Sequence, residues 1–160
     1  MTIVEFRENL KKTPRPDVMA KEIVIQDSDT LVELVKNQMQ HGNRGGVRKD
    51  VARLGWYKPR SKVDEEDGPS AYALMKHEMN PLPGLGIVDL KLTGAFYNAF
   101  YFDREALEVT SSDSKTETLK ERFGKLLFKY TPDSVRQFSH TFNDKFFAYY
   151  RAFFADENLL

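Results

Sequence analysis

The feature that most constrains this fold is an aromatic-rich segment near the C-terminus, which begins TPDSVRQF at Thr131. Thr131 is a favourable helix N-cap, Pro132 suits the first helical position, and Asp133 suits the positive end of the helix dipole. An apolar stripe then recurs at three- and four-residue steps: Val135, Phe138, Phe142, Phe146, Tyr149 and Phe153. Beside it lies a second row, Phe147, Tyr150 and Phe154. The segment 131–160 therefore predicts a long helix that is buried on more than one side or docks on another subunit.

Helices are also predicted in residues 1–41. Ile3, Phe6 and Leu10 follow helical spacing in a short opening segment, which two prolines at 14 and 16 end. From 17 to 41 the apolar spacing predicts two helices or one bent helix, interrupted at the DSD sequence of 27–29. Thr30 and Glu33 have capping-box spacing, and a glycine at 42 is a suitable helix stop.

Residues 42–86 predict an extended irregular arm and its connection to the rest of the chain. Glycines and prolines interrupt any sustained period, although AYALMKHEM (71–79) is long enough for one or two helical turns. Residues 42–62, which we call the basic arm, carry seven basic side chains against one acidic side chain and a local charge of +6. An acidic DEED sequence at 64–67 then reverses the sign.

Residues 87–130 predict the hairpin and helix of a small core. The alternation in 99–111 predicts two antiparallel strands around a DREA turn, with Leu107 and Val109 on the same side of the second strand. Ser114 and Glu117 have capping-box spacing, and Gly124 is expected to close the following helix. In the apolar run DLKLTGAFYNAFYFD (89–103), we expect Thr93 to cap a short helical turn whose first residue is Gly94, where the backbone passes close to its neighbours. Together the segments predict one α+β domain: a small antiparallel sheet packed by helices, with a long aromatic C-terminal helix.

The residues that usually perform catalysis are absent or scattered. The chain has no cysteine, and its three histidines, His41, His77 and His140, lie in separate segments without a second ligand at suitable spacing. Four adjacent acids in a Gly- and Pro-flanked loop are typically solvated and lack the burial that a general acid needs. The GNRGG sequence lacks the Gly-Lys-Ser/Thr ending of a phosphate-binding loop. We expect a non-enzymatic chain without metal or cofactor, and the absence of long apolar runs predicts no membrane span.

The basic arm is the main candidate for binding. Lys49 and the arginines interleave with Trp56 and Tyr57, a combination that suits phosphates and bases. Equal totals of 24 basic and 24 acidic residues, and the acidic run after the arm, instead favour contact with an acidic surface on a protein neighbour. Both alternatives stay open: contacts to neighbouring subunits or DNA are expected from Arg44, Arg48, Lys49, Arg53, Lys58 and Arg60. Subunit contacts are expected from Phe147, Tyr150 and Phe154.

The order of the segments along the chain is similar to that of a known protein family. A helix ending in NQMQHG is followed by LGWY, by LPGLGIVDLKLTGAFYNAFYF, by EVTSSDSKTETLKERFG and by a Thr-Pro helix start. This order resembles the tail-completion and virion-morphogenesis proteins at the head-to-tail junction of tailed bacteriophages, most closely those of phages of Bacteroidetes hosts. The resemblance covers roughly residues 30–130 and rests on Leu92, Thr93, Gly94, Phe96, Phe100, the strand through Val109, and Phe123-Gly124. The aromatic C-terminal helix lies outside the family pattern.

The resemblance implies a structural protein of the virion, assembled in the host cytoplasm. It implies identical subunits in a ring that joins portal, neck or tail proteins and lets DNA pass through its channel. The basic arm and the aromatic helix would then be assembly surfaces. The alternative is a nucleic-acid-binding module that uses the basic residues of 43–62.

Overall fold

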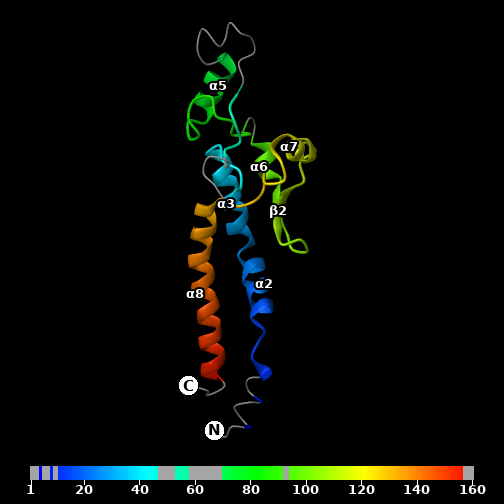
Figure 1. The fold of residues 1–160 in the computed structure, drawn as a ribbon, viewed down its shortest axis with the longest axis vertical. Coiled ribbons are helices and arrows are strands. Elements are labelled where there is room, and N and C mark those ends of the chain that lie inside the picture. Colours follow the sequence, from blue (N-terminus) through cyan, green and yellow to red (C-terminus); the bar gives the residue numbers. More distant parts are fainter. Residues whose placement is uncertain are drawn as a thin grey trace.

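The computed structural model describes residues 4, 8, 11–46, 53–57, 70–91 and 94–156, so most of the expected opening segment and the acidic run at 64–67 lie outside the described residues. The chain has an α+β fold and an elongated shape (Figure 1). A mixed body of short helices and a hairpin lies in the middle, and α5 (Ala71–Met79) lies at one end. The antiparallel helices α2 and α8 extend to the other end. We call α2 (Pro16–Gln26) and α8 (Pro132–Asp156) the two-helix stalk.

The N-terminal helices form two pieces, α2 and α3 (Ser28–Gln40), separated by Asp27 alone. The capping box expected at Thr30 and Glu33 is wrong, because α3 begins two residues before Thr30 and its N-cap is Asp27. The predicted stop is confirmed. Gly42 adopts a φ of 76° and donates its N–H to Met39, while the next residue donates to the carbonyl of Gln38. This pair of hydrogen bonds defines the Schellman motif, which requires a left-handed residue at the position of Gly42.

The hairpin is confirmed. β1 (Phe100–Asp103) pairs antiparallel with β2 (Glu108–Ser111), with Phe102 opposite Val109. The Asp103 carboxylate accepts backbone N–H bonds from Glu105 and Ala106, which fixes the turn. Leu107 does not belong to the second strand as predicted but lies in the turn with a φ of 53°. A four-residue turn leaves the chain no room to resume pairing before Glu108.

Two predicted helix starts, one on either side of the hairpin, are wrong by one residue. α6 (Ala95–Asn98) has Gly94 as its N-cap in a left-handed conformation, φ 82°, so Gly94 is not the first helical residue. Positions 92 and 93 lie outside the described residues, so the capping role expected of Thr93 is not tested. A Cβ at Gly94 would meet no atom within 4 Å, so the glycine serves backbone conformation and not close approach. α7 (Thr116–Phe123) starts after Lys115, whose N–H is bound by the Asp113 carboxylate, so Ser114 is not the cap. Gly124 closes α7 as expected.

The core lies where α3 meets the hairpin, α6, and the 123–128 segment. Val35, Met39 and Leu127 are fully buried, and Val109 is 1% exposed. An aromatic cluster fills the rest: Phe100 contacts Phe96 at a ring separation of 4.9 Å and Phe128 at 5.3 Å. Burying several aromatic rings against aliphatic side chains supplies most of the driving force for this body.

A buried glutamine connects the body to the start of α8. The Gln38 side chain donates to the carbonyl of Lys129 at 2.6 Å and accepts from the N–H of Thr131 at 2.9 Å and the hydroxyl of Ser134 at 3.1 Å. Thr131 in turn accepts from the N–H of Ser134 at 3.2 Å, so the predicted N-cap of α8 is confirmed. One amide side chain on α3 thereby sets the position and direction at which α8 leaves the body.

Candidate assembly surfaces

Two residues of the basic arm that were expected to bind a neighbour or DNA lie in the described part of the chain, and both are held by intramolecular contacts. The Arg44 guanidinium donates to the carbonyl of Phe123, at the C-terminal end of α7. Arg53 is exposed and lies over the Trp56 ring, 5.6 Å from its centroid. The other four candidate residues, Arg48, Lys49, Lys58 and Arg60, lie outside the described residues. Arg44 is therefore a structural link, while Arg53 and the 61% exposed Trp56 form a surface-facing pair.

Residues 55–57 of the basic arm are fixed to the segment that follows α5. Trp56 forms an isolated antiparallel bridge with Ile87, Tyr57 donates its N–H to Gly86 at 2.7 Å, and Val88 donates to Gly55 at 3.0 Å. These bonds satisfy backbone groups that a loop would otherwise leave to solvent. They also bring Tyr57 close to Asp89, a residue 32 positions later in the chain.

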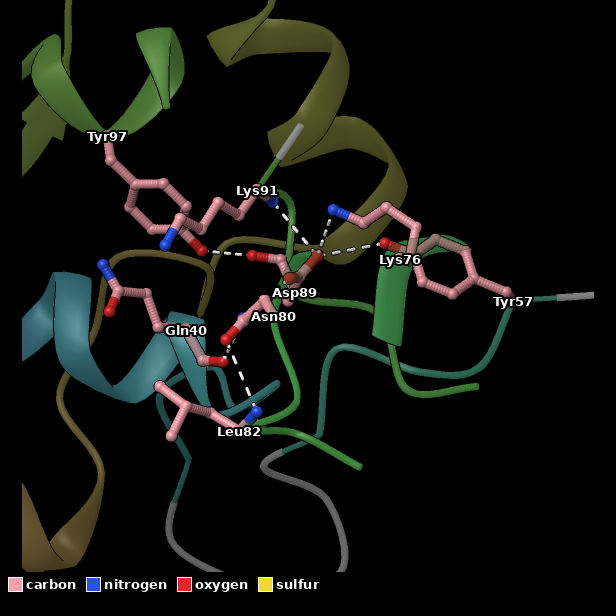
Figure 2. A network of polar contacts seen from close by, with 8 residues as sticks. All are labelled: Gln40, Tyr57, Lys76, Asn80, Leu82, Asp89, Lys91 and Tyr97. Carbon is pink, nitrogen blue, oxygen red and sulfur yellow. Dashed lines mark hydrogen bonds and ion pairs between the residues drawn. The ribbon is translucent and has the colours of Figure 1, made fainter. Parts of the chain in front are cut away.

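A buried carboxylate, Asp89, lies at the centre of this junction (Figure 2). Asp89 is 1% exposed, and its carboxylate accepts from the Tyr57 hydroxyl at 3.1 Å, the Asn80 amide at 2.7 Å and the Lys91 backbone N–H at 3.1 Å. The ammonium of Lys76, 3% exposed, lies 2.8 Å from Asp89 Oδ1 but outside hydrogen-bond geometry, so this contact is ionic. A buried charge is tolerated only with such partners.

The Asp89 network reaches the rest of the fold through two further bonds. The Tyr97 hydroxyl on α6 donates to the Asp89 carbonyl, and the Asn80 amide also donates to the carbonyl of Gln40 at the end of α3 at 3.0 Å. Burial, and then the Asp89 charge, raise the pKa of both Tyr57 and Tyr97 far above the ordinary value. Both phenols therefore stay protonated as donors, and the network joins α3, α5, α6 and the basic arm.

The sequence reasoning missed Asp89, Lys76, Asn80 and Gln38. A signal was present for two of them: Asp89 is a single acid inside the apolar GIVDL, and Lys76 is a single base following AYALM. A charge inside an apolar run is a candidate buried ion. The pairing itself depends on contacts across 13 residues, which spacing along the chain does not predict.

The aromatic face of α8 forms a ladder of rings spaced four residues apart. Phe138, Phe142, Phe146, Tyr150 and Phe154 contact each neighbour in turn, with centroid separations from 5.1 to 6.3 Å. This face lies against α2 and the first part of α3: Phe138 shares a pocket with Val24 and Leu31, and Tyr150 bonds to Pro14. From Val135 to Ala155 every side chain remains at least partly exposed, so one partner helix covers only part of the aromatic surface.

The predicted subunit-interface row does not share one environment. The Tyr150 hydroxyl donates to the Pro14 carbonyl at 2.9 Å, and Tyr150 and Phe154 belong to the half-buried ladder. Phe147 is 57% exposed and contacts Phe146 edge to face at 6.0 Å. Tyr149, which belongs to the other row of the sequence pattern, is 41% exposed. Of the three predicted contact residues, Phe147 is the one that mainly faces solvent.

A small apolar pocket of about 160 Å³ lies at the root of α8. Its walls include Val24 on α2, Leu31 on α3, Leu107 in the hairpin turn and Phe138 on α8. The Tyr130 hydroxyl in this region is buried without a hydrogen-bond partner among the described residues, and burial raises the pKa of Tyr130 to about 12.

The described ranges contain no group of three or more His, Cys, Asp or Glu side chains placed to hold a metal ion. Of the helices in the described part of the chain, none combines the length and apolar character that crossing a bilayer requires. Comparisons with protein-family models, with curated proteins and with solved structures gave no match to this chain.

Proposed function

We propose that this chain is a non-enzymatic structural protein of a bacteriophage virion, one subunit of a ring at the head-to-tail connection or tail, as in tail completion or a neck adaptor. The observation that carries the proposal is the stalk, where α8 keeps every side chain from Val135 to Ala155 partly exposed although the helix is rich in aromatic residues. Monomers rarely leave such a surface in water, and aromatic side chains are enriched at protein interfaces. The segment order of residues 30–130 supports the virion assignment.

In this role the body serves as a scaffold and the surfaces make the contacts. Phe147, Tyr150 and Phe154 lie at or beside the aromatic face and would contact identical subunits or portal, neck or tail proteins. The basic arm would contact an acidic protein neighbour or, passively, DNA in the channel. The Asp89 network supports this arrangement because it fixes Tyr57 of the basic arm to the body through buried bonds.

Co-expression with the neighbouring structural genes tests the proposal. We expect the chain to enter a defined multi-subunit complex by native mass measurement and to be present in purified virions by proteomics. Phe147→Ser should weaken that assembly, because an exposed ring contributes chiefly to contacts with other chains. Leu82→Ser, at a 54% exposed leucine three residues after the end of α5, is the matched control. A chain absent from virions and monomeric at high concentration would contradict the proposal.

One observation favours a second candidate, a nucleic-acid-binding module. Arg53 and Trp56 form an exposed cation–π pair at the described edge of the basic arm, a combination that binds phosphate and stacks on a base. This candidate predicts salt-dependent binding of the isolated protein to DNA, weakened by Trp56→Ala and by Arg53→Ala. Unchanged binding in Trp56→Ala, or no binding at low salt, would exclude it.

A further inference from the structure

The side of α8 that faces away from α2 carries an evenly spaced polar stripe. Asp133, Gln137, His140, Asp144, Phe147 and Arg151 follow one another at alternating steps of four and three residues, the spacing of a helix-to-helix seam. All six side chains are exposed. In the view of Figure 1, α2 and α3 lie along one side of α8, and the opposite side is open along its length.

The stripe is complementary to a second copy of itself that runs antiparallel, with residue 142 as the centre of symmetry. Asp133 and Arg151 lie nine residues on either side of this point, Gln137 and Phe147 lie five residues away, and His140 and Asp144 lie two residues away. Two copies of α8 packed antiparallel with this centre would place Asp133 opposite Arg151 of the second copy. They would also place His140 opposite Asp144 of the second copy, and the two-fold axis would repeat each pair.

We propose that two copies of this chain associate through the outer stripe of α8, antiparallel and centred near residue 142. The charge order selects this arrangement, since a parallel pairing would place Asp133 beside Asp133 and Arg151 beside Arg151, and like charges in contact are unfavourable. No described residue pairs with His140, Asp144 or Arg151 within the chain. Asp133 has an exposed intrahelical partner, Arg136 at 2.6 Å, and such surface pairs exchange at little cost.

This contact goes beyond the proposed virion role and does not depend on it. A two-fold contact is isologous and joins copies in pairs, whereas closing a ring needs a heterologous contact between different surfaces. Phe147 supplies the apolar part of the stripe: its ring is 57% exposed and would lie near Gln137 of the second copy, shielding the flanking polar pairs from water.

Single-cysteine variants of the full chain test the arrangement, because the natural chain has no cysteine and any link between introduced thiols must join two copies. Asn143→Cys lies one residue from the centre, so the two substituted positions would be offset by about 3 Å along the helices. Their Cα atoms would lie about 9 Å apart across the seam, too far for a disulfide but within reach of a short bis-maleimide cross-linker. Ala155→Cys is the control. At the 3.5 residues per turn of a supercoiled helix pair, position 155 lies at the same angle from the stripe as position 143. Its two copies would, however, be about 39 Å apart along the antiparallel helices. We expect the cross-linker to join the Asn143→Cys variant into dimers and to leave the Ala155→Cys variant unlinked. Linking of both variants would indicate parallel association and overturn the proposal, as would linking of neither or of Ala155→Cys alone.

Charge variants give a second, independent measurement by sedimentation. Asp144→Lys should weaken dimerisation about five- to tenfold, because the two-fold axis removes two contacts between Asp144 and His140 at once. His140→Glu combined with Asp144→Lys should restore dimerisation, since the pair is then reversed. Glu105→Lys, the same charge change in the exposed hairpin turn, is the control and should leave dimerisation unchanged. Equal weakening by Glu105→Lys, or no recovery in the double variant, would overturn the proposal.

Discussion

The buried ion pair of Asp89 and Lys76 should contribute strongly to the stability of the fold. Asp89→Leu removes the carboxylate while leaving the Lys76 ammonium 3% exposed and its charge without the carboxylate 2.8 Å away. The donors Tyr57, Asn80 and the Lys91 N–H lose their acceptor at the same time. Removing one partner of a buried ion pair costs about 3–5 kcal/mol, a large part of the roughly 5–15 kcal/mol that holds a domain folded.

The reverse change is expected to cost less. Lys76→Met leaves the Asp89 carboxylate with its three neutral donors, so the remaining charge is still stabilised by hydrogen bonds. We expect a loss of roughly 1–3 kcal/mol. In the double variant neither charge remains, so its loss should fall short of the sum of the two single losses by about 1–3 kcal/mol.

Urea unfolding followed by circular dichroism measures all three variants against the natural chain. Lys129→Met is the control, because Lys129 pairs with Glu108 at 2.7 Å but both side chains are about half exposed, and its loss should stay below about 1 kcal/mol. Additive single losses, within about 0.5 kcal/mol, would refute the coupling of the two charges. A larger loss for Lys76→Met than for Asp89→Leu would refute the role of the neutral donors.

Three further outcomes are expected. Gly45→Ala should destabilise the fold by more than about 2 kcal/mol in urea unfolding, because a Cβ there overlaps the Lys129 backbone. Gly94→Ala should cost only about 1 kcal/mol, because its left-handed backbone disfavours a side chain but open space surrounds it. Equal costs for the two variants would contradict this reasoning. Gln38→Ala should lower the free energy of unfolding by about 2–4 kcal/mol and lower the protection of backbone amides from hydrogen exchange at the start of α8. Unchanged protection there would contradict the role of Gln38 in linking α8 to the body. Tyr130→Phe should leave stability at pH 7 equal or higher, since the hydroxyl has no described partner. Because the folded pKa of Tyr130 is raised from 10.0 to about 12, the natural chain should lose stability as pH rises from 10 towards 12, and the Phe variant should lose less in pH-dependent unfolding.

The cap positions illustrate how far local sequence reaches. Thr131 and Pro132, Gly42 and Gly124 were predicted correctly because each works through hydrogen bonds to residues within a few positions. Three other starts were wrong: the Thr30 and Ser114 boxes, and Gly94 as a helical residue. Several polar residues compete near each of those starts, and the difference among candidate caps is about 1 kcal/mol or less, so packing of the helix decides.

Residue order along the chain was enough to predict the elements: an α+β fold, a hairpin around the DREA turn, helices ended by glycines, and a long aromatic helix starting at Thr131. Which side chains share an environment emerged only in the folded molecule. Whether Tyr150 or Phe147 faces solvent depends on where α2 crosses α8, and the partners of Asp89 and Gln38 come from distant segments. The physical reason is range: hydrogen bonds between near neighbours are encoded in spacing, whereas burial and ion pairing depend on chain segments that meet only after folding.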